Sequence, residues 1–79
     1  MIDSRTQDTM ISEAMREFPA TFSLRGMTDK RFRISRIASY VNDLKQVMLY
    51  TEIETKAGLW VSYCKGTPLE LRNAIVRIK

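Results

Sequence analysis

The stretch FRISRIASYVNDL, residues 32–44, decides the predicted fold. Its apolar residues recur at intervals of three and four, the period of one face of an α-helix. They are Ile34, Ile37, Ala38, Val41 and Leu44. We therefore predict an amphipathic helix over residues 32–45. Its opposite face is expected to carry Arg33, Arg36, Ser39, Tyr40 and Asp43, with Ser35 at the boundary.

Two further helices are predicted upstream of this stretch. Segment 6–18 has one helical stripe of apolar residues, made of Met10, Ile11, Ala14, Met15 and Phe18. Pro19 ends that helix, because the residue before a proline is pushed out of the α region. Residues 22–28 predict a short second helix, which Gly26 weakens by up to about 1 kcal/mol relative to alanine. The alternative for this segment is an extended piece that enters the next helix. Residues 1–6 are expected to form a flexible N-terminus.

A β-hairpin is predicted downstream of the basic stretch. Residues 47–54 and 59–65 are rich in β-forming side chains, and a loop over residues 55–58 joins them. This loop length pairs Glu54 with Leu59 and Ile53 with Trp60. The face expected to meet the core then carries Leu49, Ile53, Trp60 and Cys64. The other, half-exposed face carries Tyr50, Glu52, Val61 and Tyr63.

The end of the chain predicts a terminal helix over residues 68–78. Thr67 is placed as its N-cap, Pro68 at its first position and Glu70 at its third, which is the pattern of a capping box. The alternative is a third strand over residues 74–78, because helix and strand are easily confused in short apolar runs.

The net charge of +4 is concentrated in one segment. Residues 25–36 contain five basic side chains and one acidic one, and the other residues sum to zero. The basic residues are Arg25, Lys30, Arg31, Arg33 and Arg36, opposed by Asp29. Clustered Arg and Lys are typical of a nucleic-acid-binding surface. The alternative interpretation is a solvated basic face that has no partner.

Composition predicts one small non-enzymatic domain over residues 1–79. The chain has no histidine and a single cysteine, Cys64, so neither a Ser–His–Asp triad nor a Cys–His pair exists within it. No glycine-rich phosphate loop is present, and we expect no cofactor and no metal site. No segment approaches the roughly 20 apolar residues of a membrane helix, and no secretory signal is evident. These features favour a cytoplasmic protein without a membrane partner.

In order, these elements resemble a winged helix-turn-helix domain, an α+β fold of three helices with a hairpin wing and, here, a further terminal helix. Residues 21–28, Phe32 and residues 34–44 look like its helix-turn-helix core, and the hairpin that ends in Gly58, Leu59 and Trp60 looks like its wing. The resemblance implies a transcriptional regulator that binds duplex DNA, and it leaves open a homodimer on two half-sites. The implied contacts are Lys30, Arg31, Arg33, Ser35, Arg36, Ser39 and Tyr40 on or beside the recognition helix, and Lys56 at the wing tip.

A weaker resemblance supports a different function. Residues 19–22, the step from Gly58 to Trp60, and the pair Gly66 and Thr67 are similar to small winged-helix proteins encoded by podoviruses. Some of those proteins bind the host RNA polymerase or its sigma factor. The implied alternative is a phage-type adaptor or inhibitor that binds a host protein. Tyr50, Val61 and Tyr63 on the hairpin would suit such a partner, since tyrosine is enriched at interfaces.

Overall fold

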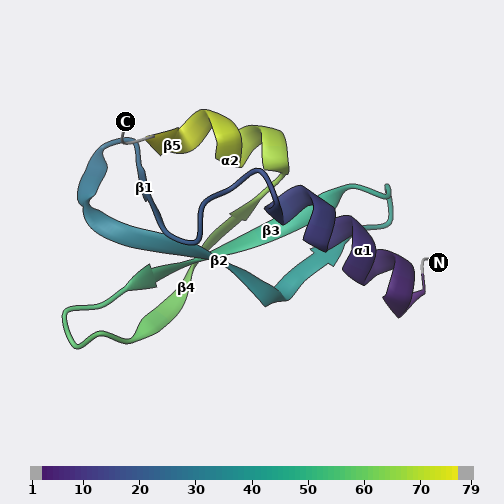
Figure 1. The fold of residues 1–79 in the computed structure, drawn as a ribbon, viewed down its shortest axis with the longest axis horizontal. Coiled ribbons are helices and arrows are strands. Elements are labelled where there is room, and N and C mark those ends of the chain that lie inside the picture. The colour runs from purple at the N-terminus through teal and green to yellow at the C-terminus, as the bar shows by residue number, and fades with distance from the viewer. Residues whose placement is uncertain (1–2, 77–79) are drawn as a thin grey trace.

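An antiparallel sheet of five strands, accompanied by two helices, makes up the part of the chain that the computed structural model describes, residues 3–76. In the sheet the strands are ordered β4-β3-β2-β1-β5, and every neighbouring pair is antiparallel (Figure 1). The elements are α1 (Ser4–Met15), β1 (Phe22–Leu24), β2 (Met27–Val41), β3 (Val47–Glu54), β4 (Trp60–Gly66), α2 (Pro68–Ala74) and β5 (Ile75–Val76).

The predicted winged helix-turn-helix fold is therefore wrong. Strand β2 occupies most of the segment predicted to be the basic recognition helix over residues 32–45. Strand β1 and the turn after it occupy residues 22–26, where the short second helix was expected. Only the β-hairpin, the first helix and part of the terminal helix remain from the predicted set.

A large bulge in β2 explains the misleading helical spacing. Ser35 pairs with Tyr50 and Tyr40 pairs with Met48, so residues 36–39 lie opposite a single residue of β3. The Ser39 hydroxyl donates to the Ser35 carbonyl at 2.7 Å and accepts the Tyr50 backbone N–H at 3.1 Å. These bonds replace part of the interrupted ladder. Ile37, at the centre of the bulge, is 100% exposed.

The bulge also changes which residues of β2 point to the core, from even-numbered residues before it to odd-numbered residues after it. Before it, Phe32 and Ile34 face the core, whereas after it Ser39 is buried and Val41 packs on the core. A strand normally alternates with a period of two. Because the extra residues shift that period, Ile34 and Val41 end up seven residues apart on the same face, which is also helical spacing.

Specific side chains and backbone conformations close the three hairpins. Gly26 and Gly58 have φ of 83° and 82°, a region that glycine occupies without steric cost. In the turn between β2 and β3, Lys45 has φ of 61°, and the Asn42 side chain accepts the backbone N–H groups of Leu44 and Gln46. Asparagine commonly organises a turn in this way.

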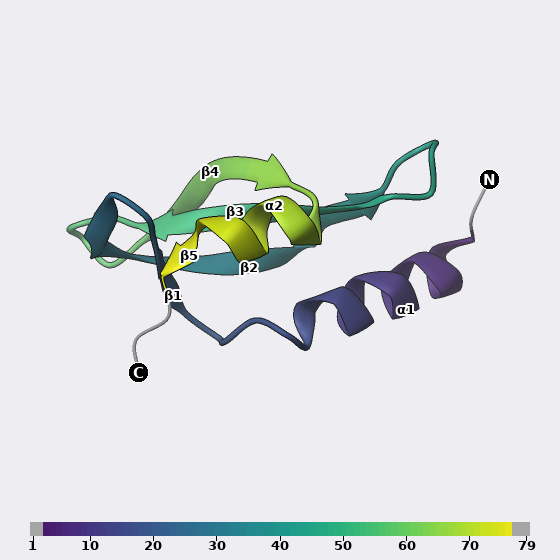
Figure 2. The same cartoon turned by 90° about the horizontal axis from the view of Figure 1, so that it is seen from above.

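The core lies between the sheet and the two helices. Phe32 and Leu49, both 0% exposed, form its centre on the sheet. Helix α1 runs along one side of the sheet (Figure 2), where it contributes Ile11, and α2 contributes Leu71. The buried cluster consists of Ile11, Phe18, Phe22, Leu24, Phe32, Leu49, Leu71 and Ile75.

The predicted hairpin is confirmed as β3 and β4, but its register differs by one residue from Glu54 to Glu52 and, beyond a bulge in β4, by two residues at Tyr50 and Leu49. Glu54 pairs with Trp60, not with Leu59, so the loop has one residue more than predicted. A shift of one residue moves a strand's side chains to the other face of the sheet. Trp60 therefore leaves the core side, to which we had assigned it, and Val61 takes its place opposite Ile53. Tyr63, also assigned to the other face, packs edge-on against Phe32, with ring centroids 5.2 Å apart.

The two ends of the described chain differ from the prediction. The N-terminal end is helical from Ser4, and the C-terminal end combines a helix with a short strand. Helix α1 already begins at Ser4, with Asp3 as its N-cap, so residues 4–6 are helical. The predicted capping box of Thr67 and Glu70 is confirmed, and α2 begins at Pro68. However, α2 ends at Ala74, and Ile75–Val76 form a strand that pairs with β1. The remainder of the predicted helix, residues 77–78, lies outside the described residues.

Candidate nucleic-acid interface

One face of the sheet points away from both described helices, and we call it the open face. Its residues alternate with the core residues along β3 and, on either side of the bulges, along β2 and β4. Across the strands, Arg33 pairs with Glu52 and Glu52 pairs with Ser62. Tyr50 likewise pairs with Lys65. The open face consists of Arg31, Arg33, Tyr40, Tyr50, Glu52, Glu54, Trp60, Ser62 and Lys65.

The first group of side chains on this face is the Trp60 cluster, defined as Trp60, Arg33 and Glu52. The Arg33 guanidinium lies over the Trp60 ring, with Cζ 4.4 Å from the ring centroid. Arg33 Nε also donates to Glu52 Oε1 at 2.8 Å. Stacking and the ion pair together fix the guanidinium as a flat cationic surface, because arginine keeps its charge and its planar fork.

The second group is the Tyr40 cluster, defined as Tyr40, Tyr50 and Lys65. The two rings lie 6.3 Å apart, and Lys65 Nζ lies 5.6 Å from the Tyr40 centroid and 5.8 Å from that of Tyr50. Lys65 Nζ donates to the Tyr40 hydroxyl at 3.1 Å. That hydrogen bond, with the nearby tyrosine hydroxyls, raises the pKa of Lys65 above its ordinary value. The ammonium is therefore charged throughout the physiological pH range.

The two clusters lie along the same strand pair. Tyr50 and Glu54, the residue opposite Trp60, are four positions apart on β3. At about 3.3 Å per residue, the clusters are about 13 Å apart along the sheet. The open face thus carries two separate aromatic surfaces, each with a cation beside it.

The basic segment of the sequence does not form a single basic patch. Arg31 and Arg33 lie on the open face, but they form ion pairs with Glu54 at 3.4 Å and with Glu52 at 2.8 Å. The other basic residues of the segment are separated from them. Arg25 lies in the turn between β1 and β2, Lys30 is half-buried in β2, and Arg36 lies in the exposed bulge.

The remaining predicted contact residues fall into two groups. Ser35 and Ser39 hold the β2 bulge together, and Ser39 is only 5% exposed, so both serve the fold. Tyr40 belongs to the Tyr40 cluster on the open face. Lys56 is exposed in the turn between β3 and β4, at the tip of the hairpin where we expected it.

Sequence reasoning missed Trp60 and Lys65 of the open face as binding candidates, and it placed Tyr50 on a surface for a protein partner without its contact with Lys65. Trp60 was assigned to the core because the predicted loop was one residue too short. The signal that points to the correct register is Gly58, whose positive φ closes the longer loop, with the Thr55 hydroxyl accepting the Leu59 N–H at 3.1 Å.

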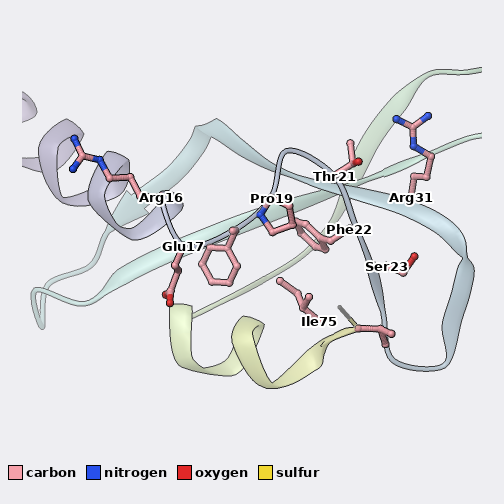
Figure 3. Close-up of a pocket in the computed structure, with 10 residues that line it drawn as sticks. Arg16, Glu17, Pro19, Thr21, Phe22, Ser23, Arg31 and Ile75 are labelled. Atoms are coloured by element: carbon pink, nitrogen blue, oxygen red, sulfur yellow. The ribbon is translucent and has the colours of Figure 1, made fainter. Parts of the chain in front are cut away.

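A hollow of about 680 Å³ lies between the segment after α1 and strands β1 and β5, and Arg31 of the open face also lines it (Figure 3). Phe22 and Ile75 belong to its apolar lining, and the guanidinium groups of Arg16 and Arg31 point away from them. Glu17 at its rim is held by Arg72 through two hydrogen bonds of 3.0 and 3.1 Å. Ser23 donates to backbone carbonyls of β2.

Among residues 3–76, no group of His, Cys, Asp and Glu side chains is arranged to hold a metal ion. Within the same residues, neither helix has the length and apolar character needed to cross a bilayer. Comparison with protein families, with curated proteins and with solved structures gives no match to this chain.

Proposed function

We propose that the protein binds nucleic acid on the open face of its sheet. The observation that carries this proposal is the pairing of aromatic rings with cations on a face that neither described helix covers: Trp60 with Arg33, and both Tyr40 and Tyr50 with Lys65. Aromatic rings and arginine planes stack on bases, and cations bind phosphates. The predicted route through a recognition helix is withdrawn, because β2 occupies that segment.

Lys65 is the phosphate contact that the geometry favours. An ammonium has three donors, and one of them is directed to the Tyr40 hydroxyl. No acidic side chain of the described chain forms an ion pair with Lys65, in contrast to Arg31 and Arg33. A charge that is already positioned and lacks a carboxylate partner is available for an incoming phosphate.

The test is fluorescence anisotropy of a labelled oligonucleotide, titrated with protein between about 50 and 200 mM salt. Lys65→Ala is expected to weaken binding and to lower the slope of log affinity against log salt by about 0.7, the value for one phosphate contact on a single strand. The matched control is Arg5→Ala, which removes the same charge from exposed α1, on the helical side of the sheet. Equal effects of the two variants, or no binding at low salt, would contradict the proposal.

A protein partner is the second candidate function, and fully exposed Ile37 favours it. Residues 33–41 of β2 pair with β3 on one side, and no described strand lies on their other side. Gln7 of α1 already accepts the Val41 N–H at 3.1 Å, so the part of this edge that a partner strand can reach is the bulge around exposed Ile37. The host RNA polymerase implied by the weaker resemblance, and a second copy of the chain, are the partners to test. Ile37→Asp is expected to abolish binding to purified polymerase, or self-association in sedimentation, whereas Leu69→Asp on exposed α2 preserves it.

A further inference from the structure

We infer that the ligand of the open face is a single strand, with bases stacked on both the Trp60 cluster and the Tyr40 cluster. This inference rests on the proposed nucleic-acid function and specifies which form of nucleic acid the face accepts. It follows from the shape of the face and from the spacing of the two clusters.

The shape of the face favours unpaired bases. The major groove of duplex DNA admits a helix or a two-stranded ribbon, and the duplex exposes only base edges there. The open face instead spans three strands, with the Trp60 cluster across β2, β3 and β4. Aromatic rings on such a surface suit bases that are free to leave the stack and lie on them.

The spacing of the clusters sets the length of strand required. A separation of about 13 Å corresponds to about four steps of a stacked strand at 3.4 Å per nucleotide, and to fewer steps of an extended one. A strand of about five nucleotides therefore reaches both clusters. This is near the lower limit of the roughly 4 to 16 nucleotides that one OB fold, another small β domain, binds.

Each cluster keeps one cation at the surface along which a strand would pass from one cluster to the other. Arg33 keeps its guanidinium plane against Trp60 while Glu52 holds its Nε, so the outer side of that plane is a second stacking surface. Lys65 lies at the other cluster, where its remaining donors can bind the phosphate between two bases. Ser62, exposed and paired with Glu52, lies between the two clusters on β4.

The experiment uses oligothymidylates of increasing length, a duplex of the same length as the longest one, and the intrinsic fluorescence of Trp60, the only tryptophan. We expect Trp60 fluorescence to be quenched on binding, and affinity to rise with length until about five nucleotides and then level off. The duplex is expected to bind at least tenfold more weakly. Both the quenching of Trp60 fluorescence and the dependence of affinity on oligonucleotide length are measured on the wild-type protein, so neither result depends on whether a variant folds.

Two variants test the stacking directly. Tyr50→Leu and Trp60→Leu are each expected to weaken single-strand binding about tenfold, with the salt slope unchanged, because stacking involves no phosphate. The control is Tyr63→Leu, which removes an aromatic ring from β4 on the helical side of the sheet and should leave affinity unchanged.

The outcomes separate this inference from the proposed function. If the duplex binds as tightly as the single strand, and both leucine variants bind normally while Lys65→Ala still weakens binding, the single-strand inference is wrong and the nucleic-acid function stands. If no oligonucleotide binds at low salt, both are wrong, and a protein partner becomes the leading function.

Discussion

Truncation of Phe32 and truncation of Ile37 should have opposite consequences for stability. The helical interpretation of residues 32–44 placed Ile37 in the apolar stripe, where loss of a buried side chain costs about 2–5 kcal/mol. In the structure Ile37 is 100% exposed in the bulge, whereas Phe32 is 0% exposed. Phe32 also stacks on Phe22 and contacts Tyr63 edge-on, with centroids 6.5 and 5.2 Å away.

The expected magnitudes follow from these environments. Phe32→Ala leaves a cavity at the centre of the core, which costs about 3–5 kcal/mol. Since a domain of this length has a total stability of about 4–12 kcal/mol, the variant loses a large part of it. Ile37→Ala changes a solvated side chain and should shift the unfolding free energy by less than about 0.5 kcal/mol. The contrast between the two variants is therefore several kcal/mol.

The assay is urea unfolding followed by circular dichroism, with the midpoint and the slope compared among variants. Phe32→Leu is included because it keeps most of the apolar volume and gives a measurable transition if Phe32→Ala is unfolded throughout. A loss of 2 kcal/mol or more for Ile37→Ala, as the helical interpretation requires, would refute the bulged strand. A loss below about 1 kcal/mol for Phe32→Ala would refute the placement of the core.

Three further predictions concern Thr51 in β3, the glycines Gly58 and Gly66 near the two ends of β4, and the α2 cap. Thr51→Val should lower the free energy of unfolding in urea by about 1–3 kcal/mol. The Thr51 side chain is 1% exposed, and its hydroxyl donates to the Cys64 carbonyl and accepts the Cys64 N–H in β4. Gly58→Ala should lower stability by about 1–2 kcal/mol, because its φ of 82° strains an alanine even though no atom lies within 4 Å of the added Cβ. Gly66→Ala, where the added Cβ makes only an ordinary contact with Glu70, should leave thermal stability unchanged or slightly raised. The backbone hydrogen bond from Thr67 lowers the pKa of Glu70 below its ordinary 4.5. The ionised Glu70 carboxylate therefore stabilises the fold fully above pH 4.5, its ordinary pKa, and this stabilisation is lost as the pH falls through the lowered pKa. Unfolding measured from neutral to acid pH should therefore show less acid sensitivity in Glu70→Gln, which keeps the cap.

Local signals predicted the local structure well. The capping residues Thr67 and Glu70, the hairpin of β3 and β4, and the first helix are each determined by short-range chemistry, and each is found. The bulge in β2 is different, because it depends on Ser39 bonding a backbone N–H in another strand. Before the bulge, the alternation of Phe32 and Ile34 with charged residues is typical of a strand, and only the extra residues disguise it.

The candidate site could be predicted only in part, because it too depends on contacts between strands that are far apart in the sequence. Charge counted along the chain marks residues 25–36, yet an extended strand sends neighbouring side chains to opposite faces. The structure accordingly brings Arg31 and Arg33 to one face and leaves Lys30 half-buried on the other. The partners Glu52 and Glu54 come from β3, which no count within the basic segment includes.

This pairing determines how the proposed binding should respond to salt. Four free phosphate contacts on a duplex would give a slope of log affinity against log salt of about −3.6. On the open face, Arg31 and Arg33 already have carboxylate partners, and Lys65 is the cation without one. With Lys65 as the main phosphate contact, the slope for a single strand is about −0.7, and stacking supplies most of the free energy. Glu52→Gln releases Arg33 from its ion pair and should therefore steepen the slope by about 0.7. A wild-type slope near −3.6, unchanged in Glu52→Gln, would mean that the ligand binds cations elsewhere on the chain and not the open face.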